Sequence, residues 1–148
     1  MEGKKYRLII LMVSLSSLAF SQDDFHEKIY ESFISNEMDS WKLVIDEMHK
    51  TNKSNPEMLK ELINYEYGYI GWCIGNNQKK QAKDYLDSME ENLETLKSGN
   101  DSKSTYHAYM AAAYGFKIGL SAWRAPFLGP RSMEHAEKAI ENDSLNFQ

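Results

Sequence analysis

Apolar residues recur at helical spacing through most of the chain, and no stretch alternates apolar and polar residues between turn dipeptides. This pattern constrains the fold more than any other feature, because it leaves no segment that could form a β-hairpin. The sequence therefore predicts an all-α fold, with connections short enough to make successive helices antiparallel neighbours. The expected helices span residues 23–35, 37–50, 56–74, 78–98, 103–123 and 130–142.

Residues that begin or end helices stand near the boundaries of these segments. Asn36 can cap the second helix, and Asn55 is followed by Pro56 at the first helical position, where the missing N–H costs nothing. Gly75 stands where a residue in the left-handed conformation would end a helix. A rigid loop over residues 124–129 should precede the last helix.

Residues 1–21 have the features of a secretory signal peptide. Basic residues precede an apolar run over 8–20, and Ala19 and Ser21 place small residues before the expected cleavage site. The run is too short for a spanning helix, which needs about 20 residues, and no Cys follows it to carry a lipid anchor. We therefore expect export to the periplasm or beyond the cell, with residues 22–148 forming one mature domain that has no membrane span.

Composition and motifs disfavour several classes of function. The chain has 17 basic and 22 acidic residues, and its net charge of −5 argues against a nucleic-acid partner. Its single Cys excludes an internal disulfide and a Cys-cluster zinc site. The sequence lacks the zinc-protease, phosphate-loop, nucleophile-elbow and dinucleotide motifs. We expect no catalytic residue, no metal and no cofactor.

The faces of the helices differ in width. Helix 78–98 has one narrow apolar stripe, so it should cover a core on one side only, whereas helix 56–74 is apolar over a broad arc and should be buried on two sides. Helix 103–123 carries an arc of small residues that would let another helix approach closely, and we expect helix 56–74 there, with Ala112 or Gly115 at the crossing. The small residues are Ser104, Ala108, Ala111, Ala112, Gly115, Gly119 and Ala122.

The second helix of each expected pair carries an apolar or small triplet at positions i, i+4 and i+7. The triplets are Trp41, Ile45, Met48; Ala82, Leu86, Met89; and Ser132, Ala136, Ala139. The third triplet leads into residues 139–146, which resemble the closing segment of a tetratricopeptide repeat. Tyr69, Ile70 and Cys73 match positions of that family's first helix, whereas Glu66 stands where the family has tryptophan.

The resemblance implies a right-handed helical-repeat solenoid of about three antiparallel helix pairs, whose concave side binds peptides or proteins without a cofactor. The spacing of the triplets, 41 and then 50 residues, departs from the family period of about 34. Trp41 occupies a position where the later triplets have small residues, so we expect it to be buried and to splay the first pair.

The candidate binding residues are mostly aromatic and lie on the two inner helices: Tyr65, Glu66, Tyr69, Trp72, Tyr106, Tyr109, Phe116 and Lys117. Aromatic stripes at helical spacing form a core in most proteins, but tyrosine rings also suit a binding groove, and Lys117 would add charge selectivity.

Two acidic positions have more than one interpretation. Glu66 lies within the apolar arc of its helix, so it is a core acid bonded to a tyrosine hydroxyl, Lys117 or Arg124, or a ligand-facing or catalytic acid. Asp46 and His49 share a helix face and could pair, or they could form a solvated helix end.

The sequence thus predicts a non-enzymatic, exported binding scaffold that docks a peptide or protein partner through an aromatic-rich helical groove. The alternative is a small helical enzyme or a ligand-binding bundle organised around a buried Glu66. A closed pocket that holds Glu66 with a His or Lys would favour the alternative, and an open aromatic groove would favour the scaffold.

The C-terminal end should leave an apolar edge uncovered. Helix 103–123 and the expected loop residues Phe127 and Leu128 form this edge, and Leu145 and Asn146 resemble the entry into another helix. A partner, self-association or a longer natural chain would cover it, and we prefer the longer chain.

Overall fold

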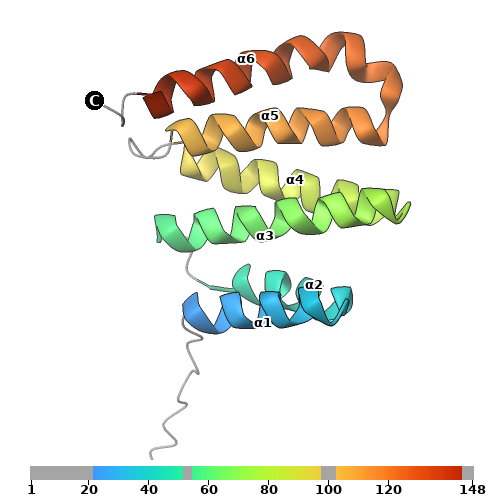
Figure 1. Cartoon of the computed structure of the whole chain (residues 1–148), viewed down its shortest axis with the longest axis vertical. Helices are drawn as coiled ribbons and strands as arrows, with labels where there is room; N and C mark the ends of the chain where they lie inside the picture. The colour runs from blue at the N-terminus through green and yellow to red at the C-terminus, as the bar shows by residue number, and fades with distance from the viewer. Residues whose placement is uncertain (1–21, 52–54, 98–102, 145–148) are drawn as a thin grey trace, which may run out of the picture.

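The computed structural model describes residues 22–51, 55–97 and 103–144, which form six α-helices, one short 3-10 helix and no strand (Figure 1). The prediction of an all-α fold is confirmed. The expected signal peptide, residues 1–21, lies outside the described residues. The helices are α1 (Gln22–Ile34), α2 (Met38–Met48), α3 (Pro56–Gly75), α4 (Lys79–Leu96), α5 (Lys103–Leu120), η2 (Ala122–Arg124) and α6 (Ala125–Ser144).

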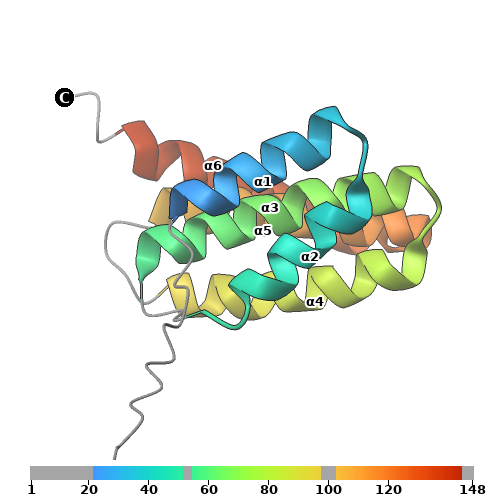
Figure 2. The same ribbon diagram turned by 90° about the horizontal axis from the view of Figure 1, so that it is seen from below.

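Consecutive helices pack as antiparallel partners, which lie across the long axis of the molecule and are stacked along it (Figure 1). Helix α1 packs on α2, α3 on α4, and α5 on α6 (Figure 1). Contacts of α3 with α2, and of α5 with α3 and α4, join these partners into one body. Figure 2 shows α2 and α4 on the same side of α3, whereas α6 lies on the other side of α5. The last two helices therefore do not repeat the geometry of the first four.

Helix α3 is the centre of the core. It contacts α2, α4 and α5, which confirms that its broad apolar arc is buried on more than one side. Helix α4 buries a single stripe and leaves all its charged side chains at least partly exposed, as its narrow apolar face predicts. The apolar residues of that stripe are Ala82, Tyr85, Leu86, Met89, Leu93 and Leu96.

The residues that begin and end the helices match the prediction at one position and differ from it at two. The Asn55 side chain accepts hydrogen bonds from two backbone amides of α3, and Pro56 follows it at the first helical position, as predicted. Asn36 does not cap α2, because its φ of 55° is left-handed and it ends α1 instead. Asn77, with a φ of 59°, ends α3 where we expected Gly75 to do so. Asparagine is the residue that best replaces glycine in this conformation.

The two asparagine turns are built alike. In each, the amide after the asparagine donates to a carbonyl five residues back, from Glu37 to Ser32 and from Gln78 to Cys73, both at 2.8 Å. The asparagines stand at positions 36 and 77, an offset of 41 that also separates the first two apolar triplets. The turn that ends α1 and the turn that ends α3 thus share one backbone conformation.

Helix α6 begins five residues earlier than predicted. The expected loop over 124–129 is wrong, because residues 125–129 form the first turn of the helix. Pro126 stands in that first turn, where its missing N–H is harmless, and Pro130 stands inside the helix and removes one backbone hydrogen bond. The Gly129-Pro130 dipeptide indicated a helix start because proline is usually found at helix ends.

Trp41 fixes α2 on α3. Its side chain is buried, with 9% exposed, and its Nε1 donates to the carbonyl oxygen of Tyr65 at 3.2 Å. The ring of Phe33 meets it edge-on, with the ring centroids 6.1 Å apart. A Cβ atom at Gly68 would lie only 2.9 Å from Cζ2 of Trp41, so the glycine makes room for the indole ring. Burial of Trp41 agrees with its expected role.

Only part of the small-residue arc of α5 packs on α6, because Ala108, Gly115 and Gly119 are exposed. The hydroxyl of Ser104 donates to the carbonyl of Ala139 at 3.0 Å, so the two backbones approach closely there. Helices α3 and α5 are neighbours, as predicted, but Gly115 is exposed and a Cβ atom added to it would meet nothing within 4 Å. The expected close crossing is therefore wrong at Gly115, whereas the alternative position, Ala112, is partly buried.

Large apolar side chains are exposed at the C-terminal end of the fold, but they lie on η2 and α6. We expected an uncovered edge made by α5 and a loop, whereas α6 packs along α5 and presents its own outer face. Within the described ranges, no helix is long and apolar enough to cross a membrane. The exposed residues at this end are Trp123, Phe127, Met133 and Ile140.

Candidate functional site

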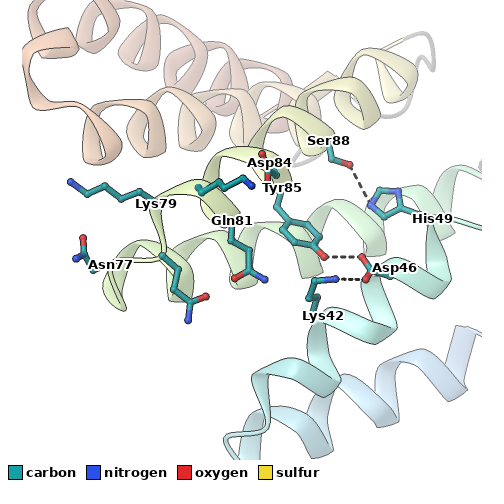
Figure 3. A pocket seen from close by; sticks show the side chains of 11 residues that line it. Lys42, Asp46, His49, Asn77, Lys79, Gln81, Asp84, Tyr85 and Ser88 are labelled. Atoms are coloured by element: carbon teal, nitrogen blue, oxygen red, sulfur yellow. Dashed lines mark hydrogen bonds and ion pairs between the residues drawn. The ribbon is translucent and has the colours of Figure 1, made fainter.

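An open groove of about 1060 Å³ lies between α2, α4 and the turn before α4 (Figure 3). Helix α2 contributes Lys42, Asp46 and His49, which stand at positions i, i+4 and i+7 of one face. Helix α4 contributes a second set with the same spacing, namely Gln81, Tyr85 and Ser88. The remaining lining residues are also polar: Asn77, Gln78, Lys79, Lys80 and Asp84.

Asp46 joins the two walls of the groove. It accepts a hydrogen bond from the Tyr85 hydroxyl at 2.7 Å and forms an ion pair with Lys42 (Figure 3). Burial would raise the pKa of Asp46, but hydrogen bonds from Lys42 and Tyr85 outweigh it, and the pKa is lowered below the ordinary value. Burial, and then the neighbouring Asp46, raise the pKa of Tyr85. At neutral pH the groove thus contains a carboxylate held by a neutral phenol and an ammonium group.

Glu66 lies beside the groove, entirely buried, and its carboxylate is satisfied. Its Oε1 accepts from the Ser88 hydroxyl at 2.8 Å and lies 2.9 Å from Nε2 of His49. Its Oε2 accepts from the Asn92 amide at 2.9 Å. The interpretation as a bonded core acid agrees with these contacts, but the expected partners, a tyrosine hydroxyl, Lys117 or Arg124, are wrong. They are wrong because Glu66 faces α2 and α4.

The arrangement of His49, Ser88 and Glu66 differs from that of a Ser-His-acid triad. In a triad, the acid binds one imidazole nitrogen and the serine binds the other. Here Nε2 of His49 lies 3.3 Å from the Ser88 hydroxyl and 2.9 Å from Glu66, so both partners share one nitrogen. The serine donates its proton to Glu66. This geometry orients the imidazole at the edge of the groove and does not activate the hydroxyl.

Three of the predicted binding residues on α3 are buried in the core or partly buried beside it. Tyr69 is buried and stacks on the half-buried Trp72, with the ring centroids 5.8 Å apart. The Tyr69 hydroxyl accepts from Gln81 of the groove wall at 2.8 Å. Tyr65 is also buried, and both its hydroxyl and Oε2 of Glu61 find no hydrogen-bond partner among the described residues. Burial, and then the Glu61 charge, raise the pKa of Tyr65 to about 12.

Two predicted aromatics of α5 gather on the α3–α5 surface. Tyr109 and Phe116 contact Tyr67, with ring centroids 5.8 Å and 5.2 Å away, and the Tyr109 hydroxyl donates to Asn64 at 2.9 Å. Tyr67 is 42% exposed. These rings therefore form a separate aromatic surface, which does not border the groove between α2 and α4.

The other predicted residues of α5 contact α4. The Tyr106 hydroxyl donates to Glu94 at 3.2 Å, and Lys117 pairs with Glu90. The eight predicted residues thus do not line a common groove, and none of them lines the groove between α2 and α4. Only Glu66 and Tyr69 touch its walls.

A signal for the groove was present in the sequence. The α2 wall residues each follow a member of the first buried triplet, and the α4 wall residues each precede a member of the second. Asp46 and His49 were candidates for pairing with each other, but Asp46 bonds to Lys42 and Tyr85, and His49 bonds to Glu66 and Ser88. The second helix wall could not be paired with the first without knowing how the helices pack.

No family model matches the sequence, and neither a curated protein nor a solved structure is detectably similar to the chain. In the part of the chain that the structure describes, no group of three or more His, Cys, Asp or Glu side chains is arranged to hold a metal ion.

Proposed function

We propose that this chain is an exported, non-enzymatic scaffold that binds an extended, acidic peptide segment of a partner protein in the groove between α2 and α4. The groove is the observation that carries the proposal: at about 1060 Å³ it is open along two helices and lined by polar side chains at regular spacing. An open groove lined by polar residues suits a peptide chain with side chains of its own to pair.

The preference for an acidic segment rests on the unpaired charge in the groove. The charge of Asp46 is neutralised by Lys42. The remaining charged residues of the groove are two positive ones, Lys79 and Lys80, and one negative one, Asp84. Both lysines stand in the first turn of α4, which has no acidic residue. Positive charges at a helix N-terminus interact unfavourably with the helix macrodipole. The two lysines therefore do not stabilise α4, and their presence there needs another reason. A cationic patch on a chain of net charge −5 would select an acidic partner.

The groove walls are also held in place before a partner arrives. The bonds from Tyr85 to Asp46 and from Gln81 to Tyr69 fix side chains of both walls. Side chains that are already ordered lose less entropy when a partner binds. The ordered walls therefore support a role of the groove in binding a partner.

In this proposal the first two helix pairs are repeats of a right-handed, tetratricopeptide-like superhelix, and α5 with α6 is a modified third pair. The offset of 41 between the two asparagine turns supports the repeats. The proposal of export rests on the signal-like residues 1–21 and includes cleavage before Gln22.

Peptide selection tests the proposed function. We would select a random peptide library on the full chain and measure binding of the enriched peptides to a variant with Lys79→Glu and Lys80→Glu. The control carries two reversals at exposed residues away from the groove, Lys103→Glu and Arg131→Glu. We expect acidic peptides that bind the wild type and the control but not the groove variant. Neutral or basic peptides, or equal binding to all three proteins, would refute the proposal.

One observation favours a second candidate, a ligand-binding or catalytic site around Glu66. The contact between His49 and Glu66 is of the kind that orients an imidazole for general base catalysis. The groove itself is open and polar, so neither a closed pocket nor an aromatic groove surrounds this pair. Hydrolysis of a panel of activated esters, compared between the wild type and His49→Ala, tests this candidate, and equal rates would exclude it for that reaction class.

A further inference from the structure

The interface between α5 and α6 has a fixed register. The Ser104 hydroxyl donates to the Ala139 carbonyl at 3.0 Å, and the Ser132 hydroxyl donates to the Ala111 carbonyl at 2.9 Å. These two bonds lie about two helical turns apart along the antiparallel helices. The backbones of α5 and α6 are therefore held close together at both bonds.

Two histidines lie between these two hydrogen bonds, one on each helix. His107 stands one turn after Ser104 on α5, and His135 stands one turn after Ser132 on α6. Their Nδ1 atoms are 3.0 Å apart, and their ring centroids are 4.9 Å apart. Both side chains are half-buried, so solvent reaches the pair. Without another partner, one Nδ1 donates a proton to the other.

We propose that His107 and His135 form a two-histidine site for a divalent late transition-metal ion, with Cu²⁺ bound in preference to Ni²⁺ and Zn²⁺. Neutral imidazole is a preferred ligand of these ions, and Cu²⁺ binds such ligands most tightly. The ion takes the place of the shared proton between the two Nδ1 atoms, and the histidine that held this proton takes one up on Nε2 from solvent, so both imidazoles stay neutral. Water completes its coordination, since the described residues supply no third clustered ligand.

The separation of the two nitrogens fits this chemistry. A metal–imidazole bond is about 2.0–2.1 Å long, so two such ligands at a right angle stand about 2.9 Å apart, against about 3.4 Å at a tetrahedral angle. The hydrogen bond holds the two nitrogens 3.0 Å apart, so they need to move little to reach the right-angle separation that tetragonal Cu²⁺ and Ni²⁺ sites use. The imidazole χ2 torsion is soft, so both rings can turn their lone pairs toward one ion.

The surroundings support two neutral, ordered imidazoles. The ring of Tyr106 lies 5.1 Å from His107, and that of Tyr114 lies 5.6 Å from His135, measured between centroids. The nearest cation on α6, Lys138, pairs with Glu134. The lone pairs of the two rings are therefore not engaged by these charged groups, and a bound ion would join α5 to α6.

Titration of the metal-free full chain with Cu²⁺ tests the site. We expect one equivalent to bind, electron paramagnetic resonance to show two nitrogen ligands, and the unfolding midpoint to rise because the ion binds the folded state. His107→Ala and His135→Ala should each abolish the two-nitrogen signal and the rise. His26→Ala, an exposed histidine on α1, is the control and should keep both. His107→Gln and His135→Gln, which retain polar side chains, repeat the test if an alanine variant does not fold.

Three results would overturn the site. The first is the absence of a bound equivalent with two nitrogen ligands. The second is loss of the signal in only one of the two histidine variants, which would indicate a different pair of ligands. The third is loss of the signal in His26→Ala, which would place the ion at α1.

Discussion

At the scale of single residues, the packing of α2 on α3 depends on a missing side chain. Trp41 fills the space over Gly68, where an added Cβ would lie 2.9 Å from the rigid indole ring. Gly71, three residues further along the same helix, faces open space. The two glycines therefore differ in the cost of a methyl group, although both stand within α3.

Alanine substitution at these two glycines should have opposite effects. Gly68→Ala should lower the free energy of unfolding by about 1–3 kcal/mol through overpacking. Gly71→Ala should leave it unchanged or raise it by up to about 1 kcal/mol, because alanine is the better helix former. Denaturant unfolding of both variants measures the difference. A Gly68→Ala protein as stable as Gly71→Ala would contradict the close contact with Trp41.

Glu66 is the buried residue whose loss should be most costly. Its carboxylate accepts from Ser88 and Asn92 and contacts His49. Glu66→Ala removes the acceptor of these groups and leaves a cavity, so we expect the free energy of unfolding to fall by about 2–5 kcal/mol. Glu66→Gln keeps the shape and one acceptor oxygen and should cost less. Thermal or denaturant unfolding gives the order, and equal losses in both variants would show that the carboxylate charge, and not the side-chain volume, matters at this position.

At the scale of helices, Asp46 links α2 to α4 and should make this link sensitive to acid. Its pKa is lower in the folded chain than its ordinary value, so the unfolded chain takes up a proton first as the pH falls. The stabilisation by Asp46 is complete above the ordinary carboxyl pKa of about 3.9. It is lost as the pH falls through the lower folded value.

Substitution of Asp46 isolates this contribution. We would measure the free energy of unfolding of the wild type and Asp46→Asn from about pH 6 down to pH 2. The advantage of the wild type over the variant should be greatest near pH 6 and shrink as the solution becomes more acidic. An advantage that is constant over this range would show that the carboxylate charge does not stabilise the α2–α4 link.

Local signals predicted the helices better than they predicted how the helices meet. Helix content and the buried stripe of α4 follow from apolar spacing, and the Asn55-Pro56 start of α3 follows from its own residues. Pro130 misled because a single lost hydrogen bond is tolerated inside α6. The small face of α5 is a packing surface only in part, and the helix that it meets, α6, has a first turn that was expected to be a loop.

At the scale of the whole molecule, the groove arises from the spacing of two helices that are distant in the sequence. Its two walls stand beside the buried triplets of α2 and α4, yet only the packing of both helices on α3 brings them opposite each other. The predicted aromatic groove did not anticipate this, because Tyr69 is buried in the core while Tyr109 and Phe116 lie on the α3–α5 surface. The two surfaces are separate, and our proposal places the docking face at the groove between α2 and α4.

Chemical-shift mapping tests most directly whether partners bind between α2 and α4, as we propose. An acidic peptide selected on the full chain would be added to the ¹⁵N-labelled protein, and the amide shifts would be followed residue by residue. We expect the largest changes in residues 42–49 and 77–88, which form the walls of the groove. Changes centred on Tyr67, Tyr109 and Phe116, with the groove unchanged, would contradict the claim and identify the aromatic surface of α3 and α5 as the binding face.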